Sequence, residues 1–553
     1  MFDNVPKKFL PPQEDWPDFV YAHPEVNWVH YKENVNACSE ILDVGIAKKG
    51  WGENVAIYDA NKDESWTYLR LQEEVNRLGN ALLKLGVQPG DRVMWRFGEV
   101  PEAAVAQLAI WKIGAINVPS ALPERAREIE FTANDTEAKI IICQGDEVDQ
   151  VLKALPSLKT VEHVISVPES RDDKLLDYRK LLDASGTDLV AYPTSPTDAA
   201  SIFYTGGTTG HPKGCIHSHA TEVIVADMVC GPSRAPTSKD VFLVLAPLGH
   251  AFGNGEKINF PFRFGAAVVY KERPSSAESW ELIEKYQVTI LAGAPTSYRL
   301  MLDFLEVDRR GKWSLRFVVA SGEMMNKDLG DNWFKKTGVE IHNSVGMTPM
   351  RHIFIESALH GIKVAPGNSV GKFVPGYEYK LVDDKGNKVK NGEIGRLAVR
   401  GLTGVVYWCN LHPQMPGKQR EDTINGWNLL DDAYTQDEDG WLYFSTRLDN
   451  MIITGGRQIA APEVEEVLSA HPAVNQVAVV GVPDPVRTNS VKAFVVLNPG
   501  YTPSEELIKE LQAYAKDNMS FYKYPRIIEF IDSLPRDAVG KIQRRLLREQ
   551  SIS

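Results

Sequence analysis

The sequence has few cysteines and no long apolar run, and these two absences narrow the classes of protein that it can encode. Five cysteines occur among 553 residues, and no two of them have the Cys-x-x-Cys spacing of a zinc or redox site. An odd number of widely spaced cysteines favours reduced thiols in a cytoplasmic protein over a disulfide framework. No stretch approaches the roughly 20 apolar residues that span a bilayer, and the N-terminus lacks the features of a signal peptide. We therefore expect a cytoplasmic protein without a membrane span.

An excess of basic residues is also lacking. The formal net charge is -12, and the acidic residues are spread along the chain. This balance argues against nucleic acid as a partner, although it leaves room for an anionic substrate at a local cationic site. The apolar fraction of 43% and the charged fraction of 24% are ordinary for a globular protein.

Buried strands and apolar helices alternate along most of the chain. Helical spacing of Leu71, Val75, Leu78 and Leu82 predicts one such helix, and short apolar runs such as 139–142, 241–245 and 317–320 predict strands. The alternation favours an α/β fold with two parallel sheets covered on both faces. From about residue 365 the pattern changes to alternating strands, which predicts a small antiparallel, barrel-like region. The last hundred residues have strands and helices of their own, so we predict an N-terminal domain of residues 1–448 and a C-terminal α+β domain of residues 449–553.

A cluster of glycines, threonines and one lysine follows the apolar run 199–203. Residues 205–214 read Thr-Gly-Gly-Thr-Thr-Gly-His-Pro-Lys-Gly. Glycines let backbone N–H groups turn toward an anion, the hydroxyls add donors, and Lys213 adds a point charge for a phosphate. The Walker pattern does not fit, because the lysine lies three residues after Gly210 and Gly214 follows it. A plain surface turn rarely combines these residues, so the segment predicts a phosphate loop.

This segment resembles the phosphate loop of the adenylate-forming superfamily, which contains acyl-CoA synthetases, adenylation domains and beetle luciferases. Further motifs follow in the expected order from about residue 60 to residue 548, and the run 347–355 most resembles benzoate- and aminobenzoate-CoA ligases. The resemblance implies binding of ATP or AMP by Thr205, Gly206, Gly207, Thr208, Thr209, Gly210, Lys213, Ser321, Gly322, Glu323, Asn343, Ser344, Val345, Gly346, Thr348, Asp432 and Arg447.

The resemblance also implies a two-step reaction in which one domain turns relative to the other. Lys541, Lys213 and His250 are the implied catalytic residues, and Asp449 is the implied hinge. A carboxylic acid would first react with ATP, with Mg²⁺ present, to give an acyl-adenylate. Coenzyme A, beside Gly455 and Gly456, would then take the acyl group.

The acyl pocket implied by the resemblance favours a compact, largely apolar acid, either aromatic or small and branched. Its candidate residues are His250, Phe252, Ala294, Gly346 and His352. A hydroxy acid also fits, because two histidines can bond a hydroxyl group. A satisfied core histidine is the plain alternative for His250, but the flanking glycines favour a pocket.

Two departures from the family pattern leave alternatives open. Val345 replaces a common aromatic residue, and Pro349 replaces the glutamate that helps to hold Mg²⁺. Either phosphate oxygens, hydroxyls and waters hold the ion, or the first step is impaired. The alternatives to an acid–CoA ligase are therefore an adenylating enzyme that loads a separate carrier protein and an impaired nucleotide-binding homologue. A monomer and a homodimer are both compatible with the sequence.

Overall fold

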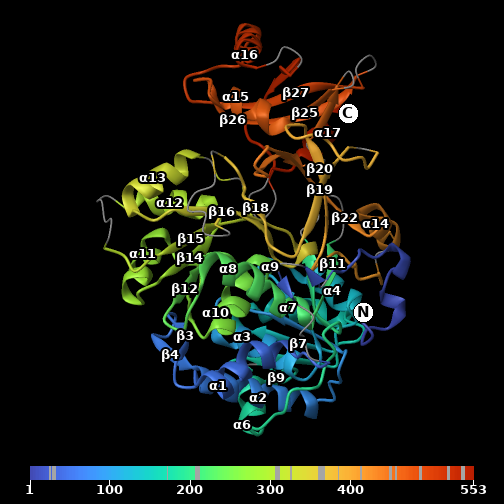
Figure 1. Cartoon of the computed structure of the whole chain (residues 1–553), viewed down its shortest axis with the longest axis vertical. Coiled ribbons are helices and arrows are strands. Elements are labelled where there is room, and N and C mark those ends of the chain that lie inside the picture. Colours follow the sequence, from blue (N-terminus) through green and yellow to red (C-terminus); the bar gives the residue numbers. More distant parts are fainter. Residues whose placement is uncertain are drawn as a thin grey trace. The chain divides into compact units, whose positions relative to one another are not determined.

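The structure is a computed structural model, and it combines distant parts of the sequence in each of two compact units. The first unit contains Met1–Thr205, Pro212–Tyr379 and Val399–Asn428, and the second contains Lys380–Ala398 and Leu429–Ser553 (Figure 1). The residues described are 1–20, 22–23, 26–27, 33–170, 172–205, 212–305, 312–323, 325, 327–358, 366, 368–383, 385–411, 414–447, 451–454, 457–484, 488–519, 523–536 and 542–552.

The first unit contains a seven-stranded sheet in the order β11-β10-β6-β5-β7-β8-β9. All neighbours are parallel except β10 and β11, which form an antiparallel hairpin at one edge. The strands are β5 (Arg92–Arg96), β6 (Ile116–Ser120), β7 (Ile140–Gln144), β8 (His163–Val167), β9 (Leu176–Asp177), β10 (Ala199–Thr205) and β11 (Lys213–Ser218). The residues of β5 and β6 are all buried, as expected for parallel strands covered on both faces.

A nine-stranded sheet in the same unit has the order β18-β17-β16-β15-β14-β12-β13-β3-β4. The strands from β16 to β3 are parallel, and antiparallel strands flank them at both edges. The strands are β3 (Val55–Asp59), β4 (Glu64–Thr67), β12 (Val241–Val244), β13 (Ala267–Tyr270), β14 (Ile290–Gly293), β15 (Phe317–Ala320), β16 (Ile341–Gly346), β17 (Ile353–Glu356) and β18 (Lys372–Phe373). The two parallel sheets confirm the predicted α/β fold, whereas the antiparallel edge strands escaped prediction.

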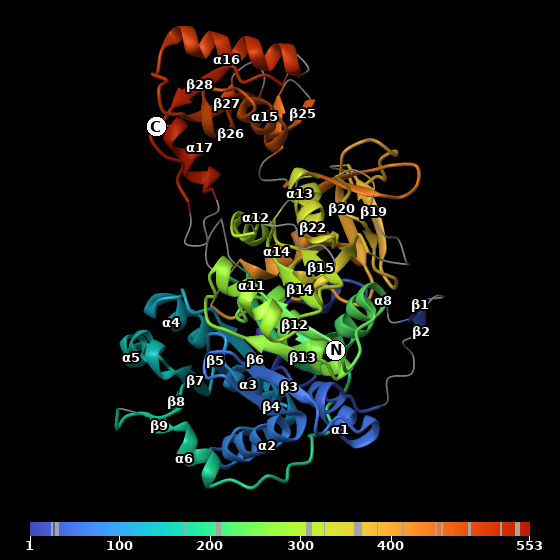
Figure 2. The ribbon, with the colours of Figure 1, turned by 90° about the vertical axis from the view of Figure 1, so that its left-hand side faces the viewer.

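Helices cover both sheets, and α3 is buried along its whole length. It packs on β5, beside which it lies in Figure 2, and on β6 of the seven-stranded sheet. The helix predicted from Leu71 to Leu82 is α2, and these leucines are buried. The helices are α1 (Val44–Lys49), α2 (Tyr68–Lys84), α3 (Pro101–Lys112), α4 (Ala126–Asp135), α5 (Val148–Ala154), α6 (Tyr178–Asp183), α7 (His219–Val225), α8 (Gly231–Arg234), α9 (Ala251–Asn254), α10 (Phe260–Phe264), α11 (Ser276–Lys285), α12 (Pro295–Asp303), α13 (Lys327–Thr337) and α14 (Met415–Asp422). Turns of π-helix at Ala226–Cys230 and Gly255–Asn259 join α7 to α8 and α9 to α10.

The first residues of the chain pack onto the seven-stranded sheet. Phe2, Val5 and Phe9 belong to its hydrophobic core, and the Phe9 ring stacks on Trp408 with centroids 4.4 Å apart. A short hairpin of β1 (Ala22–His23) and β2 (Val26–Asn27) follows.

The region of alternating strands forms a five-stranded sheet in the order β19-β20-β22-β21, with β23 paired to β22. Its strands are β19 (Glu378–Val382), β20 (Gly395–Arg400), β21 (Thr423–Ile424), β22 (Trp427–Gln436) and β23 (Leu442–Arg447).

The C-terminal part of the second unit has its own core of residues from β26, β27, α15 and α16. Its elements are β24 (Met451–Thr454), β25 (Arg457–Ala460), α15 (Ala461–Ser469), β26 (Val474–Asp484), β27 (Thr488–Leu497), α16 (Glu505–Asn518), β28 (Ile527–Phe530) and α17 (Arg544–Ile552). The domain boundary before Asp449 stays a prediction, because that residue lies outside the described part of the chain.

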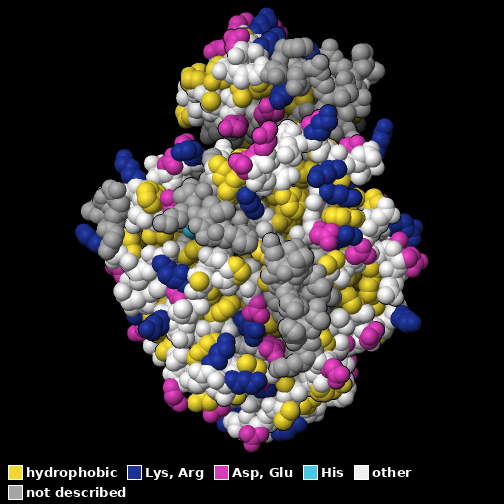
Figure 3. Space-filling view, in the orientation of Figure 1, with side chains coloured by type: hydrophobic (Ala, Val, Ile, Leu, Met, Phe, Trp, Pro, Cys, Tyr) yellow, Lys and Arg dark blue, Asp and Glu magenta, His cyan; other side chains and the backbone are white. Residues whose placement is uncertain are grey.

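The distribution of surface charge and the lengths of the helices agree with what the sequence predicts. Acidic and basic side chains are interspersed on the face shown in Figure 3. Each helix in the described ranges is too short or too polar to cross a bilayer.

Candidate active site

The carboxyl ends of β12, β14, β15 and β16 meet at one edge of the nine-stranded sheet, where open α/β sheets bind ligands. Several predicted residues lie on the turns that leave these strands. Glu323 accepts hydrogen bonds from the Thr296 backbone N–H at 3.2 Å and from its hydroxyl at 2.6 Å, so two of the turns are tied together. Gly322 has a φ of 86°, a conformation that other residues adopt only with strain. The structure thus brings Ser321, Gly322, Glu323, Asn343, Ser344, Val345, Gly346 and Ala294 to one edge.

The phosphate-loop prediction falls on the hairpin of β10 and β11. Thr205 and Lys213 face each other as the last paired residues before the connecting loop, so a hydroxyl and an ammonium group belong to the loop end of the hairpin. Both residues are half-buried. Gly206, Gly207, Thr208, Thr209 and Gly210 lie outside the described residues. Cys215 on β11 is buried, and burial raises the pKa of its thiol, which argues against a nucleophilic role.

The predicted pocket histidine His352 lies at the end of the turn of residues 348–352. It is buried, and its Nε2–H donates to the Phe252 carbonyl oxygen at 3.1 Å. Its ring lies 4.5 Å from the Phe260 ring between centroids. Burial, followed by the nearby positive charges of Arg351 and Arg234, lowers the pKa of His352 well below the usual value, so the ring is neutral near pH 7. A neutral ring among aromatic groups suits an apolar ligand.

Gly255 makes this position of the ring possible. A Cβ atom at Gly255 would lie 2.4 Å from Cδ2 of His352, which is too close for any other residue without movement of the ring. The glycine lies in the π-helical turn Gly255–Asn259, so the close approach of His352 to this turn depends on a residue without a side chain.

His250 directly precedes α9, and Phe252 lies within this helix. His250 is exposed, which rules out the alternative of a satisfied core histidine, and Phe252 is half-buried. The buried Lys257 forms an ion pair with Glu99, whose side chain is 14% exposed, behind this segment. The Lys257 ammonium also donates to the Ala246 carbonyl at 2.6 Å, and Glu99 accepts from the Leu248 N–H at 3.2 Å. The pair therefore fixes the backbone that presents His250.

The described residues contain no protein site built for a metal ion. Pro349 stands in the short 3-10 turn Thr348–Met350, and it offers no oxygen ligand in its side chain. Among the residues described, no group of three or more His, Cys, Asp or Glu side chains is placed to hold a metal. In the described part of the chain, the side chains therefore do not form a cage that fits a protein-held Mg²⁺.

The predicted residues of the second unit are described only in part. Asp432 is buried on β22 and stands opposite Arg447 on β23 in the strand register. The Tyr434 hydroxyl donates to Asp432 at 3.4 Å. Outside the described part of the chain lie the Arg447 side chain, Asp449, Gly455, Gly456 and Lys541.

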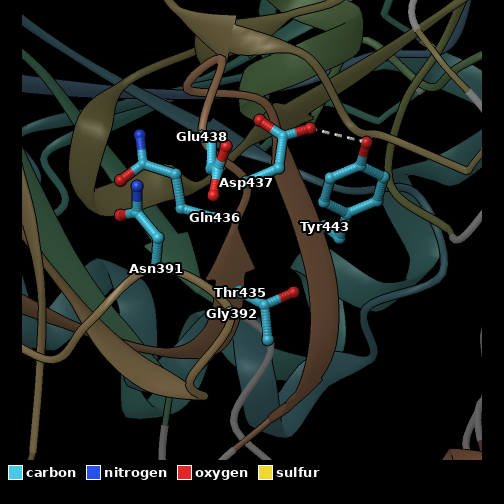
Figure 4. A pocket seen from close by; sticks show the side chains of 7 residues that line it. All are labelled: Asn391, Gly392, Thr435, Gln436, Asp437, Glu438 and Tyr443. Carbon is cyan, nitrogen blue, oxygen red and sulfur yellow. Dashed lines mark hydrogen bonds between the residues drawn. The ribbon is translucent and has the colours of Figure 1, made fainter.

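A separate hollow of about 380 Å³ in the second unit contains no predicted site residue (Figure 4). Its wall includes Asp437, whose oxygens accept from the Trp441 N–H at 2.8 Å and from the Tyr443 hydroxyl at 2.9 Å. These bonds stabilise the turn between β22 and β23, which gives Asp437 a structural role.

Sequence reasoning missed a set of buried polar residues behind the pocket. Arg351, Glu222, Asn254 and Asn259 are completely buried and hydrogen-bonded to one another. A signal was present in the sequence, because several polar residues interrupt the otherwise apolar stretch 251–264.

Comparison with known proteins agrees with this geometry. The family model described as AMP-binding enzyme matches residues 46–406, and the model of the AMP-binding enzyme C-terminal domain matches residues 463–541. The chain belongs to the AMP-binding enzyme family. It is 33% identical to a benzoate–CoA ligase of Thauera aromatica over 520 residues, which is 93% of this chain and 96% of the relative.

Solved structures of CoA ligases are also similar to this chain. A crystal structure of an anthranilate CoA ligase in complex with anthranoyl-AMP has a TM-score of 0.82 at 31% identity and covers 95% of this chain and 98% of its own. A benzoate CoA ligase from Burkholderia xenovorans LB400 has a TM-score of 0.78 at 30% identity, with coverage of 93% and 99%. The predicted superfamily, its resemblance to benzoate and aminobenzoate ligases, and the enzyme class of an AMP-forming acid–CoA ligase are thus confirmed.

Proposed function

We propose that this enzyme activates a compact carboxylic acid, either aromatic or small and branched or hydroxylated, and transfers its acyl group to coenzyme A. The observation that carries the proposal is the neutral, buried His352 between Phe252 and Phe260, at the edge where the strand ends of an AMP-binding fold meet. The benzoate and anthranilate ligases to which the chain is similar act on compact aromatic acids according to their names.

In the first step, a carboxylate oxygen of the acid attacks the α-phosphorus of ATP, and the bond to pyrophosphate breaks. Both reactants are anions, so cations and fixed donors have to offset their repulsion. Thr205 and Lys213, which face each other across the β10–β11 hairpin, would hold the outer phosphates together with Thr208 and Thr209. Lys541 would bridge the carboxylate and the α-phosphate.

In the second step, the thiol of coenzyme A attacks the acyl carbonyl carbon, AMP leaves, and the thiol proton is released. The C-terminal domain would turn about Asp449 between the steps, withdrawing Lys541 and bringing Gly455 and Gly456 to the thiol. Exchange of one domain face for another lets a single site serve both reactions. Asp432, opposite Arg447 in the strand register, would bind the ribose hydroxyls.

Mg²⁺ enters this scheme as part of the MgATP substrate. Because Pro349 offers no carboxylate, phosphate oxygens, the Thr348 hydroxyl and waters would complete the coordination of the ion, as that hard cation permits.

The direct test measures pyrophosphate release from MgATP across a panel of acids, with and without coenzyme A. The panel contains benzoate, aminobenzoates, hydroxybenzoates, cyclohexane carboxylate and small branched hydroxy acids. We expect release that depends on one class of compact acid and gives AMP, with a thioester when coenzyme A is added. Loss of release in Lys541→Ala, beside full activity in a matched control that removes the exposed Lys509 of α16 (Lys509→Ala), would support the assigned lysine.

Pro349 motivates one alternative of a different class. An impaired homologue would bind ATP without activating any acid of the panel. Binding of ATP without pyrophosphate release from any acid would favour this alternative, and turnover with a carrier protein but not with coenzyme A would favour a carrier-loading enzyme.

A further inference from the structure

Arg351 lies in the turn of residues 348–352, yet none of its surface is exposed to solvent. Its backbone has a φ of 68°, which is unusual for any residue other than glycine and turns the side chain into the interior. Burial of an unpaired charge is very costly, so the guanidinium group of this arginine must have partners in the interior.

The guanidinium group of Arg351 forms a fork with the carboxylate of Glu222 on α7. Its Nε–H donates to both oxygens at 2.9 Å, and Nη2 lies 2.7 Å from Oε2. Glu222 is also completely buried, so the two charges compensate each other away from water. Bidentate pairs of this kind have strict geometry, which makes them good positioning devices.

The remaining donors of Arg351 hold the backbone and side chains of the predicted pocket. Nη1 donates to the Ala251 carbonyl at 3.0 Å, directly between His250 and Phe252 in the sequence. Nη2 donates to the Asn254 side chain at 2.8 Å. The flat face of the group lies over Phe203, 4.3 Å from its ring centroid and two residues before Thr205 on β10.

A second layer of bonds fixes the partners of Arg351. Asn259 donates to the Glu222 carboxylate at 2.9 Å. Asn254 donates to Gln107 on α3 at 2.7 Å, and Gln107 accepts from Asn117 on β6 at 3.2 Å. The network therefore runs without interruption from the 348–352 turn to the seven-stranded sheet.

We propose that Arg351 is a positioning residue that sets which acids the enzyme prefers, because its guanidinium locks the His352 turn to the Ala251–Asn254 helix. The 3.1 Å bond between His352 and the Phe252 carbonyl spans these same two segments, so it depends on their relative position. The inference rests on the proposed function, since only that function makes these segments the wall of an acyl pocket.

The test compares two acids in competition, because the ratio of their kcat/KM values does not depend on how much of the enzyme is folded. The decisive variant, Arg351→Met/Glu222→Leu, removes both buried charges and leaves neither unpaired. We expect the preference between the best acid and a competitor of different shape to fall about tenfold, as changes in pocket shape commonly do. The KM for the acid should rise much more than the KM for ATP.

Arg263→Met/Asp227→Leu is the matched control. This pair is also bidentate, with Arg263 donating to Asp227 at 2.7 Å and 2.9 Å, but it lies between α10 and the Ala226–Cys230 turn. Its removal should leave the preference between acids unchanged. Should the Arg351 double variant not fold, Arg351→Lys serves in its place, because it retains the charge and loses the fork.

An unchanged preference in the Arg351 variants, with only a lower melting temperature, would overturn the inference and leave Arg351 as a structural residue. A wild-type enzyme that activates no acid would instead overturn the proposed function, so the two failures give different results.

Discussion

Two completely buried arginines lie near the pocket, and they differ in the number of their acidic partners. Arg351 has one carboxylate, Glu222, and its donors bind the Ala251 carbonyl and Asn254 as well. Arg234 on α8 has two carboxylates, Glu256 at 2.9 Å and Glu356 at 3.6 Å. Phe260 separates the clusters, with its ring 4.5 Å from His352 and 5.1 Å from the Arg234 guanidinium.

Similar residues at similar depth thus have different roles in this fold. In the Arg351 cluster the charges balance and the bonds run in a closed network, which favours rigidity. In the Arg234 cluster two acids share one base, and both oxygens of Glu356 lack a hydrogen-bond partner in the described part of the chain. The simplest way to balance that charge is a retained proton, so the Arg234 cluster should respond to pH and the Arg351 cluster should not.

Breaking the balanced cluster should have the largest effect. Arg351→Met leaves the Glu222 carboxylate buried without its partner, and we expect a loss of about 3–5 kcal/mol in the free energy of unfolding of the first unit. Chemical denaturation measures the loss. Lys327→Met, which breaks the exposed pair of Lys327 with Asp331, is the control and should lower the free energy of unfolding much less, since exposed pairs contribute little. Equal losses in the two variants would contradict the assigned difference.

Removing one acid of the unbalanced cluster should change the dependence of stability on pH. Burial raises the pKa of Glu256 to about 7 and the pKa of Glu356 to about 8, against the opposing attraction of Arg234. A carboxyl with a raised pKa stabilises the fold fully below its unfolded pKa, and this stability is lost as the pH rises through the folded pKa. Between its unfolded and its folded pKa, each such group lowers the free energy of unfolding by about 1.4 kcal/mol per pH unit.

The loss therefore begins near the unfolded pKa of about 4.3 and ends near pH 8. Over its upper part, between about pH 6.5 and pH 8, we expect wild-type stability to fall more steeply than that of Glu356→Gln. Thermal melts over this range measure the slope. Burial lowers the pKa of His342 to about 4 and that of His219 to about 3, so the buried histidines affect the slope only up to their unfolded pKa of about 6.5, and the interval above it reports on the carboxyl groups. Glu378→Gln, in the half-buried pair with Arg400, is the control and should parallel the wild type. If the melting temperature of Glu356→Gln followed the same pH dependence as the wild type, Glu356 would not retain a proton in the folded state.

Crowding the His352 ring should have an intermediate effect. Gly255→Ala places a methyl group 2.4 Å from Cδ2 of His352, so we expect about 1–3 kcal/mol of destabilisation together with a higher KM for the acid. Gly231→Ala is the control, because its methyl group would meet Phe264 at an ordinary 3.6 Å. Denaturation and steady-state kinetics measure the two effects. A normal KM in Gly255→Ala would place the acid elsewhere.

Restoring a carboxylate beside the balanced cluster should have the smallest effect. Pro349→Glu adds an oxygen ligand two residues before Arg351, and we expect half-maximal pyrophosphate release at about tenfold lower free Mg²⁺. Pro349→Gln has the same length without the charge and should require as much Mg²⁺ as the wild type. Identical titrations for both variants would mean that the metal does not approach this turn.

Much of the fold was predictable from the sequence, because parallel strands and amphipathic helices leave strong periodic patterns. The helix around Leu78 and the strands β7, β12 and β15 follow directly from them. The antiparallel edges, such as β17 and β18, were not predictable, because their direction depends on long-range pairing that no local pattern records.

The sequence predicted the site residues that belong to recognisable motifs. It did not predict those that depend on contacts between distant parts of the chain. His352 and Phe252 were predicted for one pocket, and the structure brings them into contact. Arg351 gave no such signal, because an arginine in a loop is ordinarily solvent-exposed, and its partner Glu222 lies 129 residues away in the chain.

The most direct test of the proposed reaction follows the oxygen atoms of the acid. The enzyme is supplied with MgATP, coenzyme A and the best acid of the panel, labelled in its carboxylate with oxygen-18, and the AMP formed is examined by mass spectrometry. Attack of the carboxylate on the α-phosphorus predicts AMP that retains a single labelled oxygen, because the thiol displaces it together with the phosphate. AMP without label, or ADP with phosphate in its place, would contradict the acyl-adenylate and with it the proposed function.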